Sequence, residues 1–383
     1  RAAQAGQTHV QLSSRRAGRA QHPHRQRARP RSKQLMEEAN KKQLPHGIYF
    51  LLTTANPAAT TLWMKCPSNR PALGVCPPSD WVDRPERQPA VCGAQGPLKG
   101  ADHDVRLPAP TRTPIKMLFM RYMRAGRPVS QQELDSTMLN ERRAPAPLIL
   151  SFKRSFHGRT LGVLSCTRSK AIHKLDVPAF QWPAHQEHNA KQEKLSLVQV
   201  EETVNRQRAT EPVAGLIVEP ILAEGGDIHA RPEYFKALRS LCSKLDVPLL
   251  VDETGGGLCG TYWAHEQWGL DSPPDAVTFS KRTLLGGIYF SDNLVPDQQY
   301  RVYNTWLGEP SKVMLLEAVI RTIKEEKLMD SVLEAGTALT KGLEGLSRAY
   351  PQLINSPAGL GIMCAVDFAD TNSRNEAVQR LRN

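Results

Sequence analysis

The chain has 383 residues, of which 40% are hydrophobic and 23% are charged. This composition is typical of a globular protein and excludes a chain that is disordered throughout. No apolar run reaches the length that a bilayer-spanning helix needs, so we expect no membrane partner.

The formal net charge of +12 is concentrated in residues 1–33, which contain eight arginines, one lysine and no acidic residue. A basic, acid-free stretch of this kind is typical of a transit segment for the mitochondrion. A basic arm that contacts nucleic acid is the alternative. We expect no nucleic-acid partner, because aromatic and basic residues do not interleave along the chain as single-strand binders require.

The seven cysteines are scattered along the chain, and no two of them form a CxxC pair. This pattern predicts reduced thiols in an intracellular protein rather than a disulfide framework. No metal-ligand spacing is visible either, so we expect no metal site.

Residues 34–114 are rich in proline and poor in periodicity, which predicts a degraded or irregular N-terminal region. From residue 115 the pattern becomes regular. Residues 115–126 (IKMLFMRYMRAG) predict a helix that closes on Gly126, and residues 147–152 (PLILSF) predict a short buried strand.

The next segments predict the core of a mainly parallel sheet. Apolar runs at 213–221, 247–253 and 275–280 predict buried strands, and residues 231–246 carry leucines at helical spacing. A strand, a helix and a second strand joined by short connections form a right-handed βαβ unit. The fold class that we expect is therefore α/β.

Residues 311–350 predict two long helices. One apolar stripe on the first of them predicts ordinary core packing and consists of Leu315, Leu316, Val319, Ile320 and Ile323. We divide the regular part of the chain into a large domain at 115–310 and a C-terminal part at 311–383.

Polar residues stand where three of the predicted strands end. These are Glu219, Asp252 with Glu253, and Ser280 with Lys281. In an open parallel sheet, ligands bind beyond the carboxyl ends of the strands. A lysine amine that loses its proton can attack a carbonyl, and a buried aspartate can pair with a protonated ring nitrogen. Together they favour pyridoxal phosphate chemistry, against the alternative of a solvated lysine and a helix-capping aspartate.

Several motifs in a fixed order carry a more specific resemblance. They include FHGRTLG at 156–162, SKAIHKLDVP at 169–178, AGLIVEPILAEGGDIHA at 214–230, TFSK at 278–281 and YNTWLGEPSK at 303–312. These stretches resemble the 4-aminobutyrate aminotransferase family of class-III, fold-type I pyridoxal phosphate-dependent transaminases. The resemblance covers residues 115–383 with few breaks.

The resemblance implies a large domain whose mainly parallel sheet is flanked by helices, with pyridoxal 5'-phosphate as cofactor. It implies transfer of the amino group of 4-aminobutyrate to 2-oxoglutarate, which gives succinate semialdehyde and glutamate. It also implies a homodimer in the mitochondrial matrix. The alternatives are another class-III transaminase of ω-amino acids, or a catalytically impaired remnant that folds or dimerises without turnover.

Carried over residue by residue, the resemblance assigns the cofactor site first. Lys281 would bind the cofactor covalently and shuttle a proton between substrate and cofactor. Asp252 would pair with the pyridine nitrogen. Phe156 and His157 match the aromatic pair of the family, in which Phe156 would stack on the cofactor ring.

The substrate side of the site follows from the same motifs. Arg159 would clamp the distal carboxylate of the substrate through its bidentate fork. Glu219 and Glu224 would line the pocket, with Glu224 resembling the carboxylate that gates between the two substrates. Thr305 would reach the cofactor phosphate of the other subunit.

The sequence also departs from the family pattern. Residues 108–114 (PAPTRTP) replace the phosphate-binding turn and the iron–sulfur ligand pair, so that ligand pair is not present, and we interpret 88–114 as an out-of-frame segment. The Val-Gln pair expected after Glu253 is missing. We expect the small C-terminal domain to be truncated at Asn383, and the turnover of this chain to be weak.

Overall fold

The computed structural model describes residues 99–104, 111–124, 147–178, 180, 182–185, 189–253, 257–296, 301–302 and 310–382. Three features predicted from sequence lie outside these residues: the basic tail at 1–33, the position of Thr305, and the helix end at Gly126. Within the described part of the chain, every helix is too short or too polar to cross a membrane.

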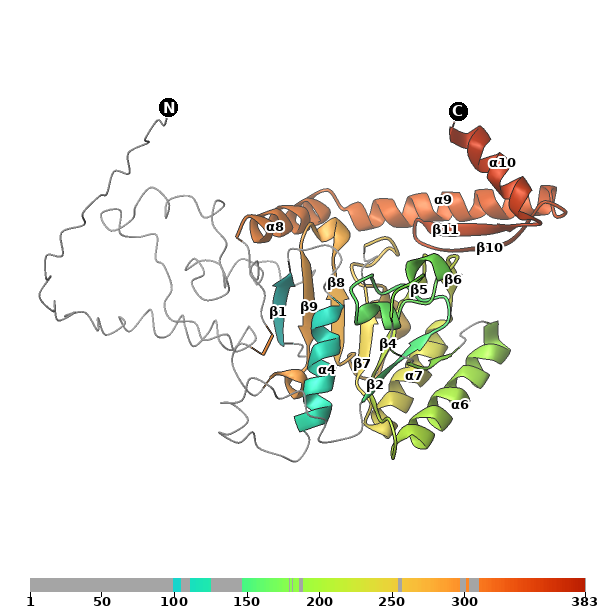
Figure 1. Cartoon of the computed structure of the whole chain (residues 1–383). Helices are drawn as coiled ribbons and strands as arrows, with labels where there is room; N and C mark the ends of the chain where they lie inside the picture. Colours follow the sequence, from blue (N-terminus) through green and yellow to red (C-terminus); the bar gives the residue numbers. More distant parts are fainter. Residues whose placement is uncertain are drawn as a thin grey trace, which may run out of the picture.

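A seven-stranded mixed sheet forms the centre of the molecule (Figure 1). Its spatial order is β1 (Lys99–Asp104), β9 (Gly286–Phe290), β8 (Ala276–Phe279), β7 (Leu249–Asp252), β4 (Val213–Val218), β2 (Leu148–Phe152) and β3 (Ala184–His185). The pairs from β8 to β3 are parallel, whereas β9 and β1 continue the sheet in antiparallel register. The predicted α/β class with a mainly parallel sheet is confirmed.

Helices cover both faces of the sheet, which explains why its central strands are apolar throughout. The helices α6 (Asn189–Gln207) and α7 (Pro232–Leu245) pack on one face, and α4 (Arg112–Arg124) packs on the other. Successive strand residues point to opposite faces, so Leu216 joins the first cluster and Ile217 joins the second.

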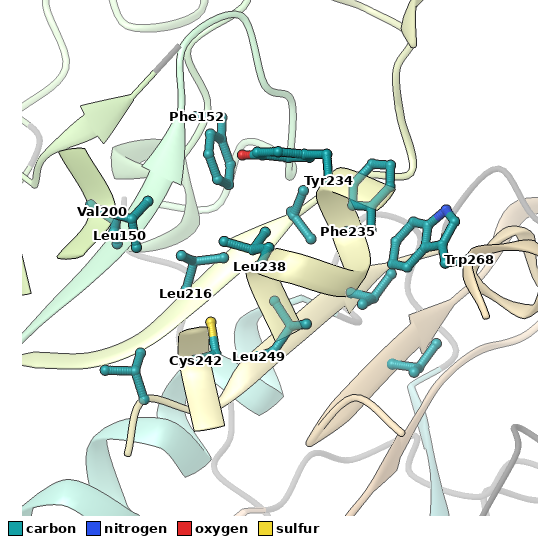
Figure 2. Close-up of a cluster of buried hydrophobic side chains, with 14 of the residues drawn as sticks. Leu150, Phe152, Val200, Leu216, Tyr234, Phe235, Leu238, Cys242, Leu249 and Trp268 are labelled. Atoms are coloured by element: carbon teal, nitrogen blue, oxygen red, sulfur yellow. The ribbon is translucent and has the colours of Figure 1, made fainter. Parts of the chain in front are cut away.

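Aromatic side chains fill the core between α7 and the sheet (Figure 2). Phe235 of α7 stacks on Trp268 with ring centroids 3.8 Å apart, and Tyr234 meets Phe152 edge to face. Leu238 lies between them and the sheet residues Leu216 and Leu249. This contact explains why the leucines of 231–246 recur at helical spacing.

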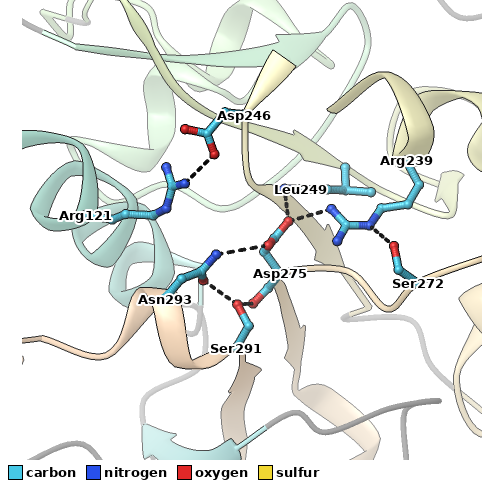
Figure 3. Close-up of polar contacts among 8 residues, drawn as sticks. All are labelled: Arg121, Arg239, Asp246, Leu249, Ser272, Asp275, Ser291 and Asn293. Carbon is cyan, nitrogen blue, oxygen red and sulfur yellow. Dashed lines mark hydrogen bonds and ion pairs between the residues drawn. The ribbon is translucent and has the colours of Figure 1, made fainter. Parts of the chain in front are cut away.

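Asp275, just before β8, organises the end of the sheet away from Lys281 (Figure 3). Its carboxylate accepts hydrogen bonds from the backbone N–H of Leu249 at 2.9 Å and from Arg239 of α7 at 2.7 Å. Ser291 and Asn293 extend this network from the turn after β9. One carboxylate therefore joins α7, β7 and β8 at a fixed register.

The C-terminal part comprises α8 (Pro310–Glu325), α9 (Leu328–Ala349), the hairpin of β10 (Ile354–Leu360) and β11 (Met363–Phe368), and α10 (Thr371–Arg382). In Figure 1, α8 and α9 run across one end of the sheet, and the hairpin lies against α9. A second short hairpin pairs β5 (Ile221–Leu222) with β6 (Ile228–His229). The two long helices predicted in 311–350 are confirmed.

Three local predictions differ from the structure. The helix predicted from residue 115 begins earlier, at Arg112, because Pro114 lies in the first turn, where a missing N–H costs nothing. Strand β1 falls inside the range 34–114, where the sequence showed no period. Leu315 is 42% exposed, so the predicted core stripe of α8 is narrower and includes Leu316 and Ile320.

Candidate active site

The carboxylate of Asp252 is buried at the end of β7. Within the described residues, its side-chain partners are two threonine hydroxyls and one histidine ring nitrogen. Thr278 of the neighbouring strand β8 donates to Oδ1 at 3.0 Å, and Thr111 donates to Oδ2 at 3.3 Å. His157 Nδ1 lies 3.0 Å from the same Oδ2. A buried carboxylate costs several kcal/mol unless it is hydrogen-bonded or paired, and these three contacts supply the hydrogen bonds.

These contacts leave one hydrogen-bonding direction of the Asp252 carboxylate open. A carboxylate has about four lone-pair directions, and three donors leave one of them for a further partner. The other ring nitrogen of His157, Nε2, is buried and has no hydrogen-bond partner within the described residues. The arrangement fits a site that is completed by a cationic group, such as the protonated ring nitrogen of pyridoxal phosphate.

Lys281 lies in the short turn Lys281–Thr283 that follows β8. Its backbone φ is +61°, in the left-handed region that residues with a side chain rarely adopt. Holding a residue in this region costs on the order of 1–3 kcal/mol and often marks a functional site. The turn directs the chain away from β8 immediately beyond the carboxyl end of the strand.

A small pocket joins the polar ends of three parallel strands. Glu219 after β4, Asp252 with Glu253 at β7 and Lys281 after β8 all line it. The structure therefore brings together the residues that the sequence placed at the strand ends, as expected for an open parallel sheet.

Glu253 also fixes the loop that brings Ala264, another lining residue, to the pocket. Its carboxylate accepts hydrogen bonds from the backbone N–H groups of Ala264 and His265 at 3.1 and 2.8 Å. The ring Nδ1 of His265 lies 2.8 Å from the same carboxylate. The two adjacent acidic residues thus have different partners, since Asp252 accepts from Thr278 and Thr111 whereas Glu253 accepts from the loop at Ala264 and His265.

A second group of charged residues is exposed and follows β2 and β5. Arg159 Nη2 lies 3.3 Å from His173 Nε2, and the Arg159 guanidinium lies 5.8 Å from the centre of the Phe156 ring. Glu224 pairs with Lys170 at 2.6 Å. Lys170, His173 and Arg159 therefore lie around the carboxylate of Glu224. Such a cluster of basic side chains also favours the binding of a second carboxylate from a ligand.

The hydrogen bond from Lys170 lowers the pKa of the Glu224 carboxyl below its ordinary value, and the charges of His173 and Arg159 add to this effect. Glu224 is therefore ionised across the neutral range and holds Lys170 in place. The residues His173 and Lys170 belong to the stretch SKAIHKLDVP, one of the motifs of the resemblance, but no spacing rule identified their contact with Glu224.

The predicted site residues thus fall into two groups. Asp252, His157, Glu219 and Lys281 lie at or beside the pocket, and Glu219 also accepts a hydrogen bond from the backbone N–H of Phe156 at 2.6 Å. The second group contains the exposed Arg159 and Glu224 and the half-buried Phe156, whose ring meets His173 edge to face. Their predicted roles stay predictions, and so does that of Thr305, which lies outside the described residues.

Comparisons with known proteins bear on the family of the chain. Residues 111–383 match a family profile described as aminotransferase class-III. The chain is 38% identical to a 4-aminobutyrate aminotransferase of Dictyostelium discoideum, over 92% of this chain and 81% of that protein. It is 41% identical to the mitochondrial 4-aminobutyrate aminotransferase of Homo sapiens, over 82% of this chain and 67% of that protein. Among solved structures, it resembles a lysine aminotransferase from M. tuberculosis with a TM-score of 0.68 at 25% identity, over 91% of this chain and 74% of that chain.

Proposed function

The chain belongs to the class-III aminotransferase family, and from this premise we propose that it is a pyridoxal phosphate-dependent 4-aminobutyrate aminotransferase. It would transfer the amino group of 4-aminobutyrate to 2-oxoglutarate, which yields succinate semialdehyde and glutamate. The observation that supports the proposal best is the pocket in which Lys281, Asp252 and Glu219 meet at the ends of three strands. The names of the relatives in D. discoideum and H. sapiens support the choice of substrate.

Pyridoxal phosphate supplies an aldehyde that condenses with amines and a protonated ring that withdraws electrons from the bound substrate. Asp252 would keep the ring nitrogen protonated, since its buried charge has one direction open for a cation. Thr278, Thr111 and His157 hold that carboxylate in place. The amine of Lys281 would anchor the cofactor and carry a proton between its Nζ and the substrate carbon.

The exposed cluster would orient the substrate. The guanidinium of Arg159 would bind the distal carboxylate of 4-aminobutyrate, and the ring of Phe156 beside it would exclude water on one side. Glu224 would compete with that carboxylate for the same bases, because it already draws Lys170 and lies 3.8 Å from His173. Such competition would allow the site to accept two substrates of different charge in turn.

We also propose that the protein acts as a homodimer in the mitochondrial matrix. Five large apolar side chains are exposed along the segment that follows Arg159; they are Leu161, Ile172, Leu175, Val177 and Phe180. Several exposed apolar side chains on one segment are typical of a protein–protein contact. The basic stretch at 1–33 and the mitochondrial relative in H. sapiens support the location.

The proposal is tested by incubating the purified chain with pyridoxal phosphate and reducing it with borohydride. We expect mass spectrometry to find the cofactor on Lys281, and a coupled assay to detect succinate semialdehyde from 4-aminobutyrate and 2-oxoglutarate. Lys281→Ala should lose both signals, whereas Arg282→Ala, at the neighbouring exposed cation, should keep the adduct. A cofactor adduct that survives in Lys281→Ala would refute the role of Lys281.

A further inference from the structure

The tip of the β10–β11 hairpin lies against the loop that carries one wall of the pocket. The backbone N–H of Ile362 at the tip donates to the carbonyl of Leu258 at 2.9 Å. Leu360 and Met363, on either side of the tip, pack against a small buried cluster of Ile221, Cys259 and Ala264. A segment about a hundred residues downstream in the chain is therefore part of the site region.

Two glycines allow this close approach. A Cβ on Gly361, whose φ is +57°, would lie 2.1 Å from the carbonyl oxygen of Leu258. A Cβ on Gly336 of α9 would lie 2.3 Å from the carbonyl oxygen of Gly361. The backbones of α9, the hairpin tip and the loop at Leu258 are thus in direct contact. This contact fixes the distance between the hairpin and the pocket.

These contacts place Met363, the first residue of β11, at the pocket. Its side chain lines the pocket together with Lys281, Asp252 and Glu219, and is the member of the lining that comes from the C-terminal hairpin. Methionine is long, unbranched and apolar, so it fills an irregular gap without adding a polar contact. It therefore limits the volume beside Lys281 without taking part in the polar chemistry there.

We propose that Met363 is a specificity-determining residue, which restricts the pocket beside Lys281 to amino donors with a short, unbranched carbon chain. The inference rests on the proposed transamination at Lys281. Truncation of Met363 opens space in an apolar part of the pocket, where one methylene changes discrimination by about 10- to 200-fold. Donors longer than 4-aminobutyrate should gain most from that space.

The enzymatic test compares Met363→Ala with Met363→Leu in the full chain loaded with pyridoxal phosphate. The preference for the longer donor 6-aminohexanoate over 4-aminobutyrate is measured as the ratio of their kcat/KM values. We expect Met363→Ala to raise this ratio by about tenfold or more. Met363→Leu keeps the side-chain volume and should leave the ratio near that of the unaltered protein. An unchanged ratio in Met363→Ala would refute the inference.

A second measurement does not depend on turnover. Cys259 is 2% exposed beneath Met363, and burial raises the pKa of its thiol to about 12, so it should react slowly with iodoacetamide. Met363→Ala should speed the labelling of Cys259, read by mass spectrometry, and Met363→Leu should not. Cys166 and Cys242 lie elsewhere in the core and report loss of the whole fold.

The outcomes separate the two proposals. If Cys259 reacts equally slowly in Met363→Ala, Met363 does not cover the pocket wall and the inference fails whatever the turnover. If the unaltered chain turns over neither donor, the proposed function fails and the specificity role with it, even where Cys259 becomes labelled. If Met363→Ala also exposes Cys166 and Cys242, Met363→Val, which removes less volume, replaces it in both measurements.

Discussion

Asp252 illustrates at the scale of one residue how the site is assembled. The sequence places an aspartate at the end of an apolar run, and this is a local signal. Its three partners come from Thr111, His157 and Thr278, which lie 141, 95 and 26 residues away along the chain. The buried charge is tolerated because these donors converge on it, not because of anything adjacent in sequence.

We predict that Thr278→Val lowers the free energy of unfolding by about 1.5–3 kcal/mol, because it removes a hydrogen bond to a buried charged group while keeping the side-chain shape. Urea denaturation measures this change. Thr337→Val on the exposed face of α9, whose hydroxyl donates to Leu333 O within the same helix, is the control and should stay within about 0.5 kcal/mol. Equal effects at the two sites would show that Thr278 does not stabilise Asp252.

A second prediction concerns His229 of β6 and pH. Burial lowers the pKa of this imidazole below its ordinary value of 6.5, and the charge of Asp227 opposes the shift only in part. Below pH 6.5 the unfolded chain therefore takes up a proton before the folded chain does, and stability falls as the pH decreases from that value towards the lowered pKa. Above pH 6.5 both states are neutral and the contribution vanishes.

His229→Gln should therefore lose less stability than the unaltered protein between about pH 7.5 and about pH 5.5, measured as urea midpoints. Burial raises the pKa of the Asp227 carboxyl from its ordinary value of 3.8 towards this window, so the same comparison is made in the Asp227→Asn background. If both proteins lose stability in parallel over the interval, His229 does not carry the pH dependence.

At the scale of elements, glycines decide how closely helices and hairpins approach. Gly215 of β4 lies under Leu118 of α4, where a Cβ would come within 2.6 Å of the leucine side chain. Gly336 and Gly361 have the same role between α9 and the β10–β11 hairpin. Gly336 could not be recognised from sequence, because a helical glycine looks the same whether its missing Cβ would meet solvent or backbone.

The third prediction contrasts two glycines of α9. Gly336→Ala should destabilise the protein by about 1–3 kcal/mol, because its Cβ would meet the carbonyl of Gly361, which cannot rotate away. Gly342→Ala has open space around it and should stabilise the protein by about 0.5–1 kcal/mol through helix propensity. Thermal and urea unfolding would measure both, and the same sign for the two variants would contradict the described packing.

At the scale of the whole molecule, the exposed apolar segment after Arg159 bears on assembly. We predict that Leu175→Glu, at a side chain that is 65% exposed, shifts the proposed dimer towards monomer in light-scattering measurements, because it places a charge in an apolar contact. Leu381→Glu, at a leucine of α10 that is 87% exposed, is the control and should leave the mass unchanged. A monomeric unaltered chain would refute the proposed homodimer.

The sequence by itself determined the α/β class, the central strands and the polar residues at their carboxyl ends. Apolar runs, helical spacing and a terminal Asp or Lys are local features of the sequence. The central strands are apolar throughout because helices bury both faces of the sheet. The boundaries of α7 and the end of α9 followed for the same reason. The early start of α4 did not, since a proline in the first turn gives the same signal as one before the helix.

Only the tertiary structure decided which distant groups meet. The donors around Asp252, the pairing of Glu224 with Lys170, and the approach of Met363 to Lys281 each join segments between 26 and 141 residues apart. No periodicity encodes such contacts, because they depend on strand order and on the backbone distances that Gly336 and Gly361 permit. The strand ends fix where chemistry can occur, and the packing of the C-terminal hairpin over them fixes how much space that chemistry has.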